Sequence, residues 1–138
     1  MIILDTNVLS ELMKPKPDTS VVCWIGKYPV TSLFITTLTQ AEILYGLEIL
    51  PAGKRRTALK KAATSMFEQD FTGRILSFDT DAAPLFATIA AKRRAIGRPI
   101  SQIDAQIAAI VLSHSATLAT RNVDDFEECG INITNPWE

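Results

Sequence analysis

The sequence contains few of the residues on which several common chemistries depend. It has one histidine, His114, and two cysteines, Cys23 and Cys129, which form neither a CxxC pair nor a disulfide framework. With a single histidine and no thiol–histidine pattern, catalysis by a Ser or Cys nucleophile has little support. Isolated cysteines are typical of a reducing compartment, so we expect a cytoplasmic protein. His114 lies between an expected helix and an expected strand, which favours a helix-end position over a general base.

Long apolar runs and an excess of one charge are also absent. No apolar segment approaches the length of a membrane span, and the apolar start meets Asp5 too soon for a secretory signal. We therefore expect no membrane association. The 14 basic and 15 acidic side chains give a formal net charge of −1, which excludes a generally basic nucleic-acid binder. Any contact with a polyanion must come from local clusters.

The rest of the composition is that of an ordinary globular protein. Of the 138 residues, 47% are hydrophobic and 21% are charged, so we expect one domain over residues 1–138. Short apolar segments that lack polar alternation are separated by amphipathic helical segments, a pattern typical of an α/β fold with a mainly parallel sheet. The expected strands are 2–4, 33–35, 75–78, 116–119 and 131–133. The expected helices are 7–13, 19–27, about 38–50, 55–71, 80–96 and 101–113.

Acidic side chains follow three of the expected strands, and another opens a buried helix. Asp5 directly follows the first strand, and Glu42 comes shortly after the second. Asp104 opens the helix over 101–113, and Asp125 follows the fourth strand. Each of them can be explained as a cap: Asp5 as an N-cap, and the others as acids three residues after a capping residue.

Taken together, however, these acids predict a cation site. Helix starts in an α/β domain can converge on the crevice at the carboxyl ends of the strands. Two carboxylates about 4 Å apart repel each other by about 4 kcal/mol at an effective dielectric of 20, so a cluster needs a proton or a cation. Mg²⁺ and Mn²⁺ prefer such oxygen ligands. Small polar neighbours can orient the carboxylates or form local turns: Thr6, Asn7, Thr37, Thr120 and Asn122.

These segments resemble PIN-domain ribonucleases of the VapC/FitB type, the toxins of bacterial type II toxin–antitoxin pairs. The resemblance rests on DTN at positions 5–7, TQAEILYGLE around Glu42, GRPISQIDAQIAAI around Asp104 and the C-terminal TLATRNVDDFEECGINITNPW. It covers essentially the whole chain. It implies a PIN-like α/β/α sandwich and an Mg²⁺- or Mn²⁺-dependent endoribonuclease that cuts RNA phosphodiesters by means of a metal-activated water.

The resemblance also implies roles for individual residues. Asp5, Glu42 and Asp104 would be the metal-binding and catalytic acids. Many relatives carry an acid where this chain has Asn122, so the fourth position falls to Asn122 or to Asp125 as a substitute, and both remain open. The orienting residues would be Thr6, Asn7 and Thr120.

Two basic clusters, at 54–61 and 92–98, can contact RNA phosphates or form solvated helix faces. Arg98 and Arg121 lie near the acids in sequence, and we expect them to contact RNA. Trp24 and Trp137 can stack on bases or pack within the protein.

The early helices carry more apolar residues than a core of this size requires. A surplus of this kind usually marks an interface. The family resemblance implies that the interface receives a small VapB/FitA-like antitoxin, whose basic side chain can enter the acidic pocket, and that the protein is a homodimer. The residues in question are Val21, Val22, Trp24, Ile25, Leu47, Ile49 and Leu50.

Two other functions remain open. Asp5 can be the nucleophile of a phosphoryl-transfer enzyme, although haloacid-dehalogenase-like phosphatases carry a second acid where this chain has Asn7. The chain can also be a catalytically weakened PIN-like module that binds RNA or a protein partner, with Asn122 as the weakening substitution. Metal-dependent cleavage of RNA, abolished by EDTA, distinguishes the three.

Overall fold

In the computed structural model, which describes residues 1–138, five short parallel strands form one sheet in the order β3-β2-β1-β4-β5. Because every pairing is parallel, the carboxyl ends of all five strands meet at one edge of the sheet. The central strand β1 pairs through Ile3 with Phe34 on one side and with Leu118 on the other. The strands are β1 (Ile2–Leu4), β2 (Leu33–Thr36), β3 (Ile75–Leu76), β4 (Thr117–Ala119) and β5 (Asn132–Thr134).

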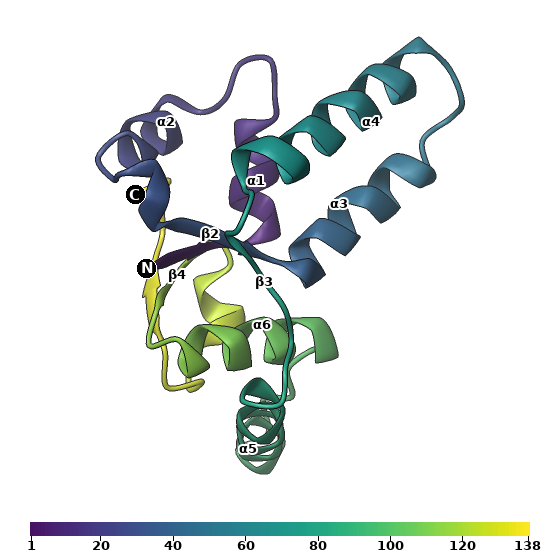
Figure 1. The fold of residues 1–138 in the computed structure, drawn as a ribbon. Coiled ribbons are helices and arrows are strands. Elements are labelled where there is room, and N and C mark those ends of the chain that lie inside the picture. The colour runs from purple at the N-terminus through teal and green to yellow at the C-terminus, as the bar shows by residue number, and fades with distance from the viewer.

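Helices cover both faces of this sheet, which confirms the α/β/α sandwich. In Figure 1, α1 to α4 lie on one side of the sheet, and α5 and α6 lie on the other. None of the helices has the length and apolar run that a bilayer crossing requires. The helices are α1 (Thr6–Leu12), α2 (Thr19–Ile25), α3 (Thr37–Glu48), α4 (Lys54–Ser65), α5 (Ala82–Ala95) and α6 (Gln102–Ser113).

The core is divided by the sheet into two clusters. Ile2 and Leu4 pack in the cluster under α1 to α4, while Ile3 packs in the cluster under α5 and α6. This alternation explains why β1 is apolar at every position, since both of its faces are covered. Helix α6 is buried over most of its length between the sheet and α5.

The element boundaries differ from the predicted ones in a few places. The strand expected over 75–78 has only two residues, Ile75 and Leu76, because its partner β2 ends at Thr36, which pairs with Leu76. Phe78 instead packs edge-on against Phe86 of α5. The helix expected over 55–71 ends as the π-helical turn η2 (Met66–Asp70). The remaining helical segments are two short 3₁₀ turns, η1 (Val30–Ser32) and η3 (Val123–Phe126).

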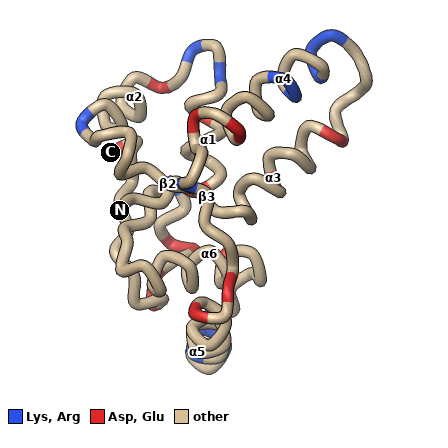
Figure 2. The backbone as a smooth tube through the Cα atoms, viewed as in Figure 1, with Lys and Arg blue, Asp and Glu red and all other residues tan.

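Helices α3 and α4 form an antiparallel hairpin that extends away from the sheet (Figure 1). Glu48 near its turn pairs with Arg56 at 3.0 Å and with Lys60. Figure 2 shows basic residues along the outer part of α4 and in the loop between α1 and α2.

The predicted apolar interface is only partly exposed. Val22 and Ile49 are 45% and 66% exposed, whereas Val21, Trp24 and Leu47 are buried in the core beneath α1 to α4. Ile25 and Leu50 are partly buried and pack against that core. The prediction is therefore wrong for the buried members, which pack inside the protein because α2 and α3 each turn an apolar side toward the sheet.

Candidate functional site

Asp5 lies at the centre of the carboxyl edge, directly after β1. Its carboxylate caps α1, since Oδ1 accepts the backbone N–H of Thr6 at 2.9 Å. Oδ2 accepts the hydroxyl of Thr120 at 2.8 Å and the side-chain amide of Asn7 at 3.3 Å. The predicted orienting residues Thr6, Asn7 and Thr120 therefore all contact Asp5, which is only 5% exposed.

The surroundings of Asp5 disfavour its charged form. Burial raises its pKa from 3.8 to about 6, and the nearby charges of Asp104 and Glu42 add to this increase. The hydrogen bonds from Thr120 and Thr6 oppose it. A cation close to Asp5 would reverse this effect, because opposite charge stabilises the ionised carboxylate.

Glu42 points from α3 toward the start of α1. Its Oε1 accepts the hydroxyl of Thr6 at 2.7 Å, and the Thr6 oxygen also lies 3.1 Å from the hydroxyl of Thr39. The capping explanation for Glu42 is wrong: the N-cap of α3 is Thr36, whose hydroxyl accepts the N–H of Thr39 at 3.1 Å. Glu42 thus lies in the second turn, where a cap is not needed.

Asp104 enters the site from the first turn of α6. Ser101 is the N-cap, and its hydroxyl accepts the Asp104 N–H at 3.2 Å, as the sequence predicted. Burial raises the pKa of Asp104, and the charges of Asp125 and Glu42 raise it further, while Ser101 and Arg93 lower it. The charge of Glu42 therefore acts on both Asp5 and Asp104, whereas that of Asp125 acts on Asp104.

No basic side chain forms an ion pair with any of these four acids, because all the ion pairs lie elsewhere. The acids do not form a closed ligand shell either, as no three Asp, Glu, His or Cys side chains are already arranged around a metal position. The donor set nevertheless fits a hard divalent cation: it consists of oxygen atoms, carries uncompensated negative charge and is partly desolvated.

Asn122 and Asp125 lie on the β4 side of the acids. The backbone N–H of Asn122 donates to the hydroxyl of Thr120 at 3.0 Å, and its side chain makes no capping bond to η3. Both side chains are exposed, and the charge of Asp125 raises the pKa of Asp104.

The three arginines near the site have different surroundings. Arg98 pairs with Glu127 at 3.1 Å, and Arg121 lies over the ring of Trp137, 4.9 Å from its centroid. Arg93, part of the predicted basic cluster at 92–98, does not lie on a solvated helix face: it is 4% exposed and donates to the backbone carbonyls of Arg98, Asp125 and Glu127.

The helix-end position predicted for His114 is confirmed, since it is exposed at the C-terminal end of α6. Of the two alternatives for Trp24, the structure shows packing within the protein: Trp24 is buried and packs on Tyr28, with ring centroids 5.0 Å apart.

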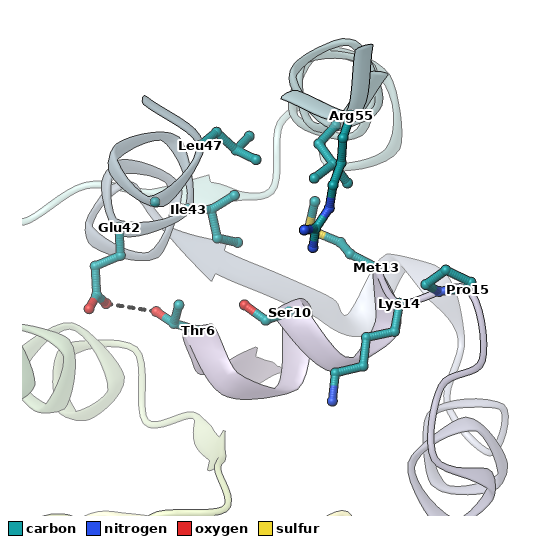
Figure 3. Close-up of a pocket in the computed structure, with 11 residues that line it drawn as sticks. Thr6, Ser10, Met13, Lys14, Pro15, Glu42, Ile43, Leu47 and Arg55 are labelled. Carbon is teal, nitrogen blue, oxygen red and sulfur yellow. Dashed lines mark hydrogen bonds between the residues drawn. The ribbon is translucent and has the colours of Figure 1, made fainter. Parts of the chain in front are cut away.

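A groove that the sequence did not reveal extends from Glu42 between α1, α3 and α4. Its volume is about 320 Å³, and Figure 3 shows the Glu42–Thr6 hydrogen bond at one end and Arg55 reaching from α4 toward Met13 at the other. Ile43 and Leu47 line the middle. One signal was available: Thr6, Ser10 and Met13 recur at helical spacing and all line this groove.

Comparison with known proteins places the chain in a well-defined group. The PIN domain profile matches residues 2–131. The chain is 41% identical to VapC ribonuclease Y4jK of Sinorhizobium fredii, covering 100% of this chain and 99% of that protein. It is 35% identical to toxin FitB of Neisseria gonorrhoeae, covering 99% of each. The structure of FitAB bound to an IR36 DNA fragment superposes with a TM-score of 0.94 at 35% identity, covering 100% of this chain and 96% of that one.

Proposed function

This chain belongs to the PIN-domain family, and from that premise we propose that it is an Mg²⁺- or Mn²⁺-dependent endoribonuclease, the toxin of a type II toxin–antitoxin pair. The observation that carries the proposal is the group of carboxylates at the carboxyl edge of the sheet, Asp5, Glu42 and Asp104, none of which forms an ion pair with a basic side chain. The relatives named for ribonuclease or toxin activity support it.

Asp5, Glu42 and Asp104 would hold the divalent ion, with Asn122 or Asp125 at the fourth position. When bound, such an ion polarises the scissile phosphate and lowers the pKa of the attacking water. The chain supplies the orientation: Thr120 and Asn7 hold one oxygen of Asp5, and the Thr6 hydroxyl holds Glu42.

Arg121 is the stronger candidate for a contact with RNA phosphate. Its side chain is exposed and has no carboxylate partner, and its backbone N–H donates to Asn7 at 3.1 Å, which places it beside Asp5. Arg98 already pairs with Glu127 at 3.1 Å, so an RNA phosphate would have to compete with that carboxylate. Both arginines keep their proposed role in RNA binding.

The partners proposed for this chain are a VapB/FitA-like antitoxin and a second copy of itself. The groove beside Glu42 suits the antitoxin: its middle is apolar, and a basic side chain at the Glu42 end would neutralise the same carboxylates that bind the ion. The second copy has an apolar surface available on α3, where Tyr45 and Ile49 are 67% and 66% exposed.

Purified protein, freed of antitoxin, provides the test. We expect it to cut RNA in Mg²⁺ or Mn²⁺, to stop in EDTA, and to lose activity in Asp5→Asn and Asp104→Asn while both variants stay folded. Asp81→Asn is the matched control, because Asp81 is exposed and its side chain makes no capping hydrogen bond. Cleavage that persists in EDTA or in either site variant would refute the proposal. RNA binding without any cleavage would instead favour the catalytically weakened module.

A further inference from the structure

A second, polar pocket opens at the carboxyl ends of β4 and β5. Its volume is about 380 Å³, close in size to the groove beside Glu42 but different in character. The groove is largely apolar, whereas nearly all the side chains that line this pocket can form hydrogen bonds. They include Arg121, Asn122, Asp124, Asp125, Asn135 and Glu138.

The pocket is joined directly to the acidic site. The Arg121 N–H donates to the Asn7 Oδ1 at 3.1 Å, and the Asn122 N–H donates to the Thr120 Oγ1 at 3.0 Å. Asn7 and Thr120 are the two side chains that hold Oδ2 of Asp5. One side chain therefore separates the pocket from the central carboxylate, so an RNA strand at the acids would place a neighbouring nucleotide here.

Arg121, which lines the pocket, has a planar guanidinium on which a base can stack. The guanidinium of Arg121 lies over Trp137, with Cζ 4.9 Å from the ring centroid, and no carboxylate binds it. Unpaired RNA bases commonly stack on arginine planes and aromatic rings. Arg121 on Trp137 provides such a platform.

The polar side chains have a definite donor and acceptor pattern. Oδ1 of Asn135 accepts the backbone N–H of Trp137 at 3.0 Å, which leaves the Asn135 Nδ2 hydrogens available to a ligand. The Asp124 and Asp125 carboxylates can only accept when ionised. Asp124 contacts Arg98 through its backbone carbonyl, so its carboxylate stays free.

We propose, on the basis of the nuclease function above, that this pocket binds a guanine base next to the cleaved bond. The Watson–Crick edge of guanine has the acceptor O6 beside the two donor groups N1–H and N2–H₂, which match an amide donor beside carboxylates. Uracil has one donor between two acceptors, cytosine has one donor beside two acceptors, and adenine has one donor beside one acceptor. Uracil and cytosine would turn an acceptor toward a carboxylate, and adenine, with one donor group, would leave one carboxylate without a hydrogen bond.

The nucleotides GMP, AMP, CMP and UMP are suitable probes, followed by NMR on the full chain with Mg²⁺ present. The protein has two tryptophans, so two indole N–H signals are expected, and Trp24→Phe assigns them. We expect GMP to shift the Trp137 signal with an affinity about ten-fold above that of the other nucleotides, the size of one discriminating base contact. The Trp24 signal should stay fixed, because Trp24 is buried against Tyr28.

A matched pair of variants tests the assigned donor. Asn135→Asp keeps an oxygen for the Trp137 N–H but removes the Nδ2 hydrogens, and should abolish the preference for GMP. Asn132→Asp makes the same chemical change at an exposed position in β5 and should preserve the preference.

Equal shifts with all four nucleotides, or an unchanged preference in Asn135→Asp, would overturn the proposal. Mapping of cleavage sites separates it from the proposed function. If RNA is cleaved with no guanine at a fixed position beside the cut, and GMP does not bind, the guanine pocket is refuted while the nuclease proposal stands. GMP binding at Trp137 without any RNA cleavage refutes the nuclease and supports the pocket.

Discussion

At the scale of single residues, Asp5 is the most buried of the acidic side chains. Its folded-state pKa of about 6 exceeds the usual 3.8. The folded protein therefore binds more protons than the unfolded chain between about pH 4 and 6, and stability falls as the pH rises through that window. The fall attributable to Asp5 is about 3 kcal/mol, at about 1.4 kcal/mol per pKa unit.

This predicts that Asp5→Asn has a flatter dependence of stability on pH than the wild type. Urea denaturation in EDTA at several values between about pH 4 and 8 measures it, with Asp81→Asn as control. A smaller slope should remain in the variant, because burial also raises the pKa of Asp104. An identical slope in wild type and Asp5→Asn would contradict the environment described for Asp5.

The fourth position gives a second prediction at this scale. If Asn122 is a weakened ligand position, Asn122→Asp adds negative charge and should lower the Mg²⁺ concentration needed for half-maximal RNA cleavage. Mg²⁺ titrations of the initial rate measure this. An unchanged midpoint in Asn122→Asp, together with an inactive Asp125→Asn, would assign the fourth role to Asp125.

Local patterns were a good guide to some site residues and a poor guide to others. The capping roles of Asp5 and Ser101 depend on neighbours in sequence, so they could be predicted. The hydrogen bond from Thr6 to Glu42 joins residues 36 positions apart and depends on how α1 packs against α3. Burial of Arg93 was missed for the same reason, since its carbonyl partners Asp125 and Glu127 lie far along the chain.

At the scale of elements, helices α1, α3 and α6 position the acids, and the caps at helix starts can be compared. Ser101 accepts a backbone N–H at the start of α6, whereas Asp81 at the start of α5 makes no side-chain capping bond. We expect Ser101→Ala to lower the free energy of unfolding by about 1 kcal/mol. Asp81→Ala should cost clearly less. Denaturant unfolding measures both, and equal losses would mean that the cap bond contributes nothing.

Most elements could be predicted because their apolar periodicity is strong. Of the two clear failures, one has a tertiary cause and the other reflects a segment without an apolar pattern. The strand over 75–78 was expected to be longer than β3, which ends at Leu76 because its partner strand β2 ends at Thr36, the residue paired with Leu76. The turn at Val30–Ser32 carries no apolar pattern at all, and all its residues are at least partly exposed.

At the scale of the whole molecule, the groove between α1, α3 and α4 predicts where the antitoxin binds. Gly46 lines this groove, and a Cβ added there meets no atom within 4 Å, so a larger side chain can start into the groove without a clash at its Cβ. Gly46→Leu should therefore abolish co-purification with the small protein encoded immediately upstream, while Gly46→Ala should retain it. Helix propensity favours both variants over glycine. Retention of the partner by Gly46→Leu would place the partner elsewhere.

The order of the strands in the sheet could not be predicted from the sequence patterns either. Alternating strands and helices predicted an α/β fold, but only the observed order β3-β2-β1-β4-β5 explains why Glu42 and Asp104 lie close enough to Asp5 to raise its pKa. Asp5 ends the central strand, Glu42 follows its neighbour β2 through α3, and α6, which carries Asp104, leads into β4 on the other side. The family resemblance implied that these three acids act together, which local sequence patterns could not predict.

The central claim is that these three carboxylates form one divalent-cation site. Calorimetric titration of Mn²⁺ into the antitoxin-free protein tests it most directly, because binding is measured without RNA. We predict saturable binding in the wild type and in Asp81→Asn, and loss of that binding in Asp5→Asn and Asp104→Asn. Equal Mn²⁺ binding by the wild type and Asp5→Asn, or no binding by the wild type, would contradict the account.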